Sequence, residues 1–175
     1  MEEKTCCFTG HRPQGLPWGE NEDDPRCMAL KALLAQEVEQ AWKDGFRHFW
    51  CGMAQGADLY FAETVLACQA VHPEAALYAA IPCPTQTRGW SAEQVARYHR
   101  VLDWIGLRRQ VLVEPVWSRH CMTHRDRFMV ERSSRILAVY DGRGSGGTHY
   151  TLQYALEQGL EAIILDPVSL RLRRG

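Results

Sequence analysis

Six short apolar runs, spaced along the whole chain, constrain its fold more than any other feature of the sequence. Within each run the apolar residues mostly follow one another instead of alternating with polar ones. That pattern is typical of strands covered on both faces, as in a parallel sheet. The runs are Thr5–Thr9, His48–Cys51, Ala76–Ile81, Gln110–Val113, Arg135–Tyr140 and Ala162–Leu165.

Segments with helical periodicity separate these runs. In the clearest of them, Asp24 suits the N-cap, Pro25 the first turn and Gly45 the C-terminal end of a helix. Four further helices are expected: after Gly56, from Ser91, over about Met122–Arg132, and from the Gly146–Gly147 turn to Gly159.

Strand and helix therefore alternate along the chain, and crossovers between parallel strands are right-handed. The sequence predicts an α/β fold with one Rossmann-like domain over residues 1–170. Its sheet is expected to be open, mostly parallel and of about six strands, with helices on both faces. A length of 175 residues suffices for one such domain. Residues 171–175 are basic and are expected to form a frayed tail.

The charge and the hydropathy argue against several classes of protein. A formal net charge of -1 is unfavourable for a dedicated duplex-DNA-binding protein. No apolar run reaches the roughly 18 residues that a membrane span needs, so no membrane partner is expected. The N-terminus begins with acidic residues and lacks the basic flank of a secretory signal. We therefore expect a cytoplasmic protein.

The seven cysteines are odd in number and irregularly spaced. Cys6, Cys7, Cys51 and Cys83 lie in or beside the apolar runs, so we expect free thiols that fill the core. The sequence contains no Cys-x-x-Cys pair, and its histidines show no zinc-ligand spacing. No metal site is predicted.

The turn after the first strand carries a candidate site. In an open parallel sheet, ligands bind beyond the carboxyl ends of the strands. Gly10 allows a tight turn there, and Thr9, His11 and Arg12 offer polar groups. The guanidinium of Arg12 could bind two oxygens of a phosphate or carboxylate at once. The alternative is an ordinary turn with solvated side chains.

The turn after the second strand lies between Gly52 and Gly56 and leads directly into a helix. Free backbone N–H groups and the helix dipole should both face the crevice at such a turn. Asp58 lies in the first helical turn, where it could cap the helix or accept a hydrogen bond from a ligand hydroxyl. Two spaced glycines alone are weak evidence.

The turn after the fifth strand gives the strongest signal, with four glycines within residues 142–147. Each glycine raises the entropy lost on ordering the loop, so a purely structural role is hard to justify. The loop is neither a Walker A motif nor the usual dinucleotide fingerprint, and a floppy surface turn is the alternative. Its candidate ligand contacts are Asp141, Gly142, Ser145, Gly146, Gly147 and Thr148.

The helix over about 122–132 is unusually basic. Most of its charges should form a solvated face, but we expect Arg125 to reach the crevice.

Three motifs together resemble one family: Thr-Gly-His-Arg-Pro at 9–13, Gly-x-x-x-Gly-x-Asp at 52–58, and Asp-Gly-x-x-x-Gly-Gly-Thr at 141–148. They resemble the YpsA-like branch of the SLOG superfamily, the Rossmann-like group that includes the Smf/DprA and LOG proteins. The resemblance covers nearly the whole chain, with the motifs in the same order. It implies a ligand that is a nucleotide or is derived from one.

The LOG enzymes of this superfamily hydrolyse an N-glycosidic bond with an arginine and a Gly-Thr-x-x-Glu loop. Arg125 and Gly147-Thr148 are similar to these elements, but Thr151 stands where the resemblance requires the glutamate. Cleavage of a glycosidic bond needs a carboxylate. Asp58 and Asp141 are the remaining acid–base candidates, and whether the chain is an enzyme stays open.

The leading hypothesis is binding or sensing of a nucleotide such as AMP, ADP-ribose or a dinucleotide. Gly144–Thr148 would hold phosphate, Arg12 and Arg125 would neutralise charge, and Asp58 would meet a ribose. A LOG-type hydrolase or transferase is the alternative. DprA-like binding of single-stranded nucleic acid, with a loop tryptophan (Trp18, Trp90 or Trp117) stacked on a base, ranks third. A homo-oligomer is possible, and no cofactor beyond the nucleotide is expected.

Overall fold

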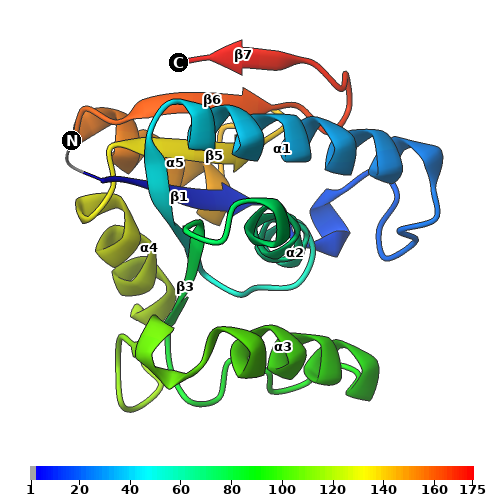
Figure 1. Ribbon diagram of the computed structural model, residues 1–175. Helices are drawn as coiled ribbons and strands as arrows, with labels where there is room; N and C mark the ends of the chain where they lie inside the picture. The colour runs from blue at the N-terminus through cyan, green and yellow to red at the C-terminus, as the bar shows by residue number, and fades with distance from the viewer. Residues whose placement is uncertain (1–2) are drawn as a thin grey trace.

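A computed structural model, which describes residues 3–175, places all the strands in one open sheet (Figure 1). The order across the sheet is β4-β3-β2-β1-β5-β6-β7, and only β7 runs antiparallel to its neighbour. The strands are β1 (Lys4–Gly10), β2 (Phe46–Cys51), β3 (Ala76–Ile81), β4 (Gln110–Leu112), β5 (Arg135–Val139), β6 (Glu161–Leu165) and β7 (Leu172–Arg174). The predicted α/β class and the mostly parallel sheet are confirmed.

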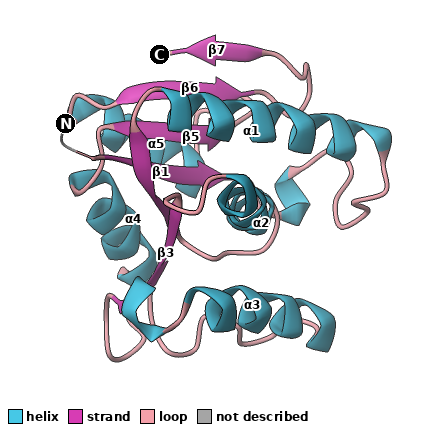
Figure 2. Ribbon diagram, in the orientation of Figure 1, coloured by secondary structure: helices cyan, strands magenta, loops and turns pink. Residues whose placement is uncertain are grey.

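Helices cover both faces of the sheet (Figure 2). One core contains buried residues of the first three helices, and a second core on the other face contains those of the last two. The five helices are α1 (Pro25–Lys43), α2 (Ala57–Val71), α3 (Ala92–Ile105), α4 (Cys121–Glu131) and α5 (Gly147–Glu157), and two 3-10 turns cover Pro13–Gly15 and Leu107–Arg109.

The expected caps start the helices where the sequence indicated. The Asp24 side chain accepts a hydrogen bond from the backbone N–H of Arg26 at 2.8 Å, and Ser91 accepts one from Gln94 at 3.2 Å. After α1, Gly45 adopts a φ of 98°, a conformation that favours glycine. Local chemistry therefore sets these boundaries.

The expectation of a frayed tail is wrong for residues 172–174. The chain reverses after β6, where the Leu170 N–H donates to the Asp166 carbonyl at 2.8 Å and Asp166 N–H donates to the Arg171 carbonyl at 3.0 Å. The residues that follow then pair with the open edge of β6 as β7. An unpaired edge offers free backbone groups, and this pairing satisfies them despite the basic sequence.

The thiols behave as predicted for the described residues. All seven cysteines are free, and all except the half-buried Cys68 are buried. Over residues 3–175, none of the helices has both the length and the apolar character required to cross a bilayer.

The order of the strands fixes where a ligand site is expected. From β1 the chain builds outward through β2, β3 and β4, and then returns to place β5 on the other side of β1. The connections therefore diverge between β1 and β5, which is the switch point at which open α/β sheets bind ligands.

Candidate functional site

A crevice of about 430 Å³ lies at this switch point, beyond the carboxyl ends of β1 and β5. Its wall comes from the turns after these two strands and from α2 and α4. Three arginines and two aspartates bring charge to it. Its lining residues are Phe8, Thr9, Gly10, His11, Arg12, Gln14, Gly15, Ala54, Asp58, Met122, Arg125, Asp126, Arg143, Ser145, Gly146, Gly147 and Thr148.

The turn after β1 packs tightly against the start of α2. A Cβ atom on Gly10 would lie 2.6 Å from the Cβ of Ala57, so only glycine fits there. The His11 carbonyl accepts a hydrogen bond from the Ala57 N–H at 3.1 Å. At Gly56, where φ is 82°, a Cβ would lie 2.8 Å from that same carbonyl oxygen. Gly10 and Gly56 therefore join the first two turns.

His11 joins the first turn to the third. Its Nε2 accepts a hydrogen bond from the Asp141 N–H at 3.1 Å, which requires the neutral ring. Burial lowers the pKa of His11, although the neighbouring Asp141 carboxylate opposes this shift. The sequence predicted that His11 offers a polar group to the ligand; His11 does line the crevice, but its Nε2 is engaged within the protein.

Asp141 is also engaged within the protein. Arg143 donates to its carboxylate at 2.9 and 3.0 Å from Nε, and these bonds lower the pKa of Asp141 to about 2. A second guanidinium nitrogen of Arg143 donates to the Gly15 carbonyl at 3.3 Å. Arg143 thus closes the loop over the turn after β1 and brings its own charge to the crevice.

The glycine loop presents the start of α5 to the crevice. Gly146, the N-cap, has a φ of 95° and no side chain with which to cap the helix. The first N–H groups of a helix have no partners within it, so those of α5 remain available to a ligand or to water. Ser145, Gly146, Gly147 and Thr148 all line the crevice.

Arg125 supplies a buried positive charge, with only 4% of the residue exposed. Its Nη1 donates to the Gly52 carbonyl, and its Nε donates to Asp126 at 2.6 Å. Burial opposes the charge, yet Asp126 and Asp58 raise the pKa of Arg125 above its usual value. A Cβ on Gly52 would lie 2.6 Å from Arg125 Nη1, so this glycine leaves room for the arginine.

Asp58 is the buried carboxylate of the crevice. Burial raises its pKa to about 6, while the charge of Arg125 lowers it. Its Oδ2 accepts a hydrogen bond at 3.0 Å from the N–H of Ala54, which lies in the turn that precedes α2. Asp58 therefore braces this turn and still lines the crevice.

A second carboxylate lies beside Thr151. The hydroxyl of Thr151 donates to Asp126 Oδ2 at 2.9 Å, while the other oxygen of Asp126 accepts from Arg125. Asp126 therefore links α4 to α5 and lines the crevice. Position 151 itself carries no carboxylate, as expected from the sequence. Its hydrogen-bond partner, Asp126, nevertheless brings a carboxylate to the same place.

The structure brings most of the predicted residues to one place. Ten of the fourteen line the crevice, namely Thr9, Gly10, His11, Arg12, Asp58, Arg125, Ser145, Gly146, Gly147 and Thr148. Gly52, Gly56, Asp141 and Gly142 stand outside the lining.

Sequence reasoning missed several lining residues. Arg143 lies within the glycine loop and Asp126 next to Arg125, so their neighbours in sequence were the available signal. Nothing in the sequence distinguished Gln14, Ala54 or Met122.

The loop tryptophans have separate surroundings. Trp18 is buried, and its Nε1 donates to the Tyr60 hydroxyl at 3.1 Å. Trp117 is 62% exposed and lies outside the crevice. Trp90 lines a cavity of about 110 Å³ that shares Arg12, Gln14, Ala54 and Met122 with the crevice. Trp117 lines another cavity, which shares only Met122 with the crevice, so Trp90 has the larger overlap with the crevice lining.

Comparison with a solved structure supports the fold. The X-ray structure of TM1055, a Northeast Structural Genomics Consortium target, aligns with a TM-score of 0.56 and 12% sequence identity. The alignment covers 93% of this chain and 74% of that one.

Sequence relatives cover most of the chain. The UPF0398 protein of Bacillus pumilus is 25% identical over 152 residues, which are 87% of this chain and 81% of the relative. That of Bacillus thuringiensis (strain Al Hakam) is 25% identical over 156 residues, 89% of this chain and 84% of the relative. The YpsA family model, described as the YspA SLOG family, matches residues 6–164. The chain therefore belongs to the YpsA family of SLOG proteins.

Proposed function

We propose that the crevice binds a phosphate-bearing nucleotide or nucleotide derivative, such as AMP, ADP-ribose or a dinucleotide. The observation that carries the proposal is the meeting of the uncapped start of α5 with the fixed charge of Arg125 in one crevice. Helix N-termini favour anions, and a guanidinium can bind two phosphate oxygens. Membership of the SLOG group supports the same ligand class.

The remaining wall suits the rest of a nucleotide. Asp58 offers a carboxylate oxygen to a ribose hydroxyl, and Arg12 and Arg143 add charge for a second phosphate. The adjoining cavity gives Trp90 as the partner for a base, since aromatic rings stack on bases without strong sequence preference. Trp90→Leu should weaken binding of AMP but not of inorganic phosphate. Trp104 is exposed on α3, so Trp104→Leu is the control and should leave both affinities unchanged.

Isothermal titration with a panel of nucleotides tests the proposal. A Cβ on Gly147 meets no atom within 4 Å, so Gly147→Asp places a carboxylate at the start of α5 without a clash. An aspartate is favourable for a helix at this position, and it should abolish binding by repelling phosphate. The sequence predicted that Gly144 also holds phosphate, but Gly144 does not line the crevice. Gly144→Asp is therefore the matched control, because Gly144 has equally open space in the same loop.

The panel would contradict the proposal in either of two ways. One is that no nucleotide binds the unaltered protein more tightly than millimolar. The other is that Gly147→Asp binds as well as Gly144→Asp.

A second candidate function is cleavage of the N-glycosidic bond of such a ligand. Two carboxylates, Asp58 and Asp126, favour it because both line the crevice beside Arg125. In this reaction the bond between C1′ and the base nitrogen breaks, water adds its hydroxyl to C1′, and a proton passes to the base. Asp58, with a pKa raised to about 6, suits acid–base work near neutral pH, whereas Asp141 at about 2 does not.

Chromatography of free base and ribose phosphate tests for this reaction. Asp58→Asn and Asp126→Asn should each abolish product, and Asp103→Asn, on the exposed part of α3, should retain it. Absence of product from every nucleotide that binds would leave binding as the function and dismiss the enzyme.

The cytoplasmic location stays a prediction, and the free state of all seven cysteines supports a reducing compartment. A homo-oligomer also stays a prediction.

A further inference from the structure

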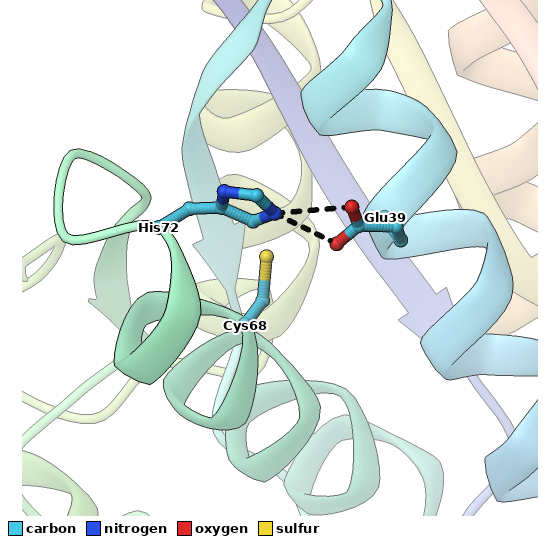
Figure 3. A group of neighbouring side chains, drawn as sticks. All are labelled: Glu39, Cys68 and His72. Atoms are coloured by element: carbon cyan, nitrogen blue, oxygen red, sulfur yellow. Dashed lines mark hydrogen bonds and ion pairs between the residues drawn. The ribbon is translucent and has the colours of Figure 1, made fainter.

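Three side chains with metal-binding atoms meet at the opposite end of α2 from Asp58 (Figure 3). Cys68 lies in the last turn of α2, His72 directly follows this helix, and Glu39 faces them from α1. The ligand atoms of all three residues lie within 4.8 Å of one another.

Helical geometry brings the thiol and the imidazole together. The His72 N–H still donates to the Cys68 carbonyl at 2.8 Å, so the helical register continues from residue 68 to residue 72. Residues four apart lie on the same side of a helix, as in the paired histidines of helical zinc sites. Figure 3 shows the Cys68 sulfur directed toward the His72 ring and the Glu39 carboxylate.

The other two ligands are already oriented. His72 Nε2 lies 3.0 Å from both carboxylate oxygens of Glu39. The Trp42 ring stacks on the His72 ring with centroids 4.6 Å apart, which restricts rotation of the imidazole. Around one zinc ion, ligand atoms lie about 3–4 Å apart, given bond lengths of about 2.0–2.3 Å. The ligand atoms of the three residues, all within 4.8 Å of one another, are therefore close to the spacing that zinc requires.

We propose that Glu39, Cys68 and His72 bind one divalent transition-metal ion, with zinc the best fit. Thiolate, imidazole and carboxylate are the ligands that zinc takes, whereas magnesium and calcium require oxygen ligands. Glu39 and Cys68 also line an open groove of about 420 Å³ between α1 and α2. The fourth tetrahedral position would therefore be open to water.

This site is separate from the nucleotide crevice. Asp58 and Cys68 are ten residues apart on α2, which corresponds to about 15 Å along a helix. The sequence did not reveal the site, because Glu39 comes from α1, whereas Cys68 and His72 come from the end of α2 and the residue after it. Its test is therefore independent of any result with nucleotides.

Titration of the reduced, tag-free whole chain with Co²⁺ alone tests the proposal. We expect thiolate-to-cobalt charge-transfer absorption that saturates at one ion per chain and is removed by Zn²⁺. Cys68→Ser should abolish this absorption. Since loss of an outer-shell partner already weakens metal binding about 10- to 100-fold, His72→Ala and Glu39→Ala should weaken it at least tenfold.

Two matched variants separate this site from ordinary side chains. Cys27→Ser removes a buried thiol from α1, the helix that carries Glu39, and His48→Ala breaks a histidine–carboxylate pair with Glu3 at 2.7 Å. Both should bind cobalt as the unaltered protein does. Glu39→Gln, which keeps the side-chain volume, serves if Glu39→Ala fails to fold, and it should also weaken binding.

Three results would overturn the proposal and leave a histidine–glutamate hydrogen bond. They are no thiolate absorption with excess Co²⁺, absorption that persists in folded Cys68→Ser, or an affinity unchanged by both the Glu39 and the His72 substitutions.

Discussion

Single residues in the crevice hold one another in place before any ligand arrives. Arg125 is bound to the Gly52 carbonyl and to Asp126, and Asp58 is bound to the Ala54 N–H. A buried charge without such partners is strongly destabilising, so each pairing is a condition of the fold as well as of the site.

The stability of the protein should depend on pH through Asp58. Its pKa rises from 3.8 in the unfolded chain to about 6 in the folded one, so protonation stabilises the fold at low pH. This contribution is fully present below about pH 4 and is lost as the pH rises through about 6. Asp58→Asn removes this titration. The unfolding free energy of the variant minus that of the unaltered protein should therefore increase by up to about 3 kcal/mol as the pH rises from 4 to 7.

Urea unfolding of both proteins at several pH values measures this difference. A constant gap across the range would show that Asp58 ionises normally. Asp103→Asn, an exposed carboxylate, is the control and should show no such trend.

Gly52→Ala should displace Arg125, because the new Cβ would lie 2.6 Å from its Nη1. The arginine can move aside, so the loss of stability should be small. The direction of the Arg125 guanidinium would change, however, and with it any hydrogen bond that Arg125 donates to a ligand. Such a charge-assisted hydrogen bond is worth about 1.5–3 kcal/mol. Nucleotide affinity should fall about tenfold or more, as measured by titration calorimetry. Gly144→Ala, with open space around its Cβ, should bind normally; an equal loss in both variants would refute this role for Gly52.

The residues that the sequence revealed are those whose type is unusual for their place. Glycines crowded after a strand, an aspartate at a helix start and an arginine on a basic helix could be identified in this way. The hydrogen-bond partners of these residues could not be identified from the sequence, because they depend on the directions of side chains that meet only in the folded protein. His11 and Asp141 were expected to contact the ligand; His11 does line the crevice, but its Nε2 accepts a hydrogen bond from the Asp141 N–H at 3.1 Å, and Asp141 stands outside the lining.

At the scale of elements, the first six strands were predictable because each is a continuous apolar run that needs cover on both faces. Their observed ends differ from the predicted ones by at most two residues. The seventh was not, because Leu172–Arg174 is short, mostly basic and exposed. Its conformation comes from pairing with β6, which no local pattern encodes.

Removal of residues 172–175 should leave the fold intact and free one edge of the sheet. All three residues of β7 are exposed, so little apolar burial is lost. The outer backbone groups of β6 would become available for pairing with another chain. We expect a small decrease in melting temperature and concentration-dependent association in light scattering.

Leu172→Ala keeps the strand backbone and is the control for loss of the side chain alone. If the truncated protein stays as monodisperse as this variant, β7 does not protect the edge.

Across the whole molecule, basic and acidic residues nearly balance, with 20 Lys and Arg against 21 Asp and Glu. The formal net charge is -1, while three arginines line the crevice. Trp104 and Trp117, both more than half exposed, lie outside the crevice. A track for single-stranded nucleic acid aligns several exposed aromatic rings along an extended basic groove, whereas these two exposed tryptophans lie apart from the crevice.

We therefore expect no complex with a single-stranded oligonucleotide at about 0.15 M salt, where unpaired surface charges are screened beyond about 8 Å. A gel-shift assay over several salt concentrations checks this. A shifted band that weakens steeply with salt would instead support the nucleic-acid hypothesis. Loss of that band in Arg127→Ala, a residue of α4, would locate the surface.

The hydrogen bond from Arg125 to the Gly52 carbonyl has a thermodynamic consequence for any ligand that binds in the crevice. A long side chain that becomes immobilised on association typically loses about 0.5–1.5 kcal/mol in rotamer entropy. Arg125 already lost that freedom when the chain folded. An incoming anion therefore meets a preorganised partner, and its association should carry a smaller entropic penalty than capture by a mobile surface arginine.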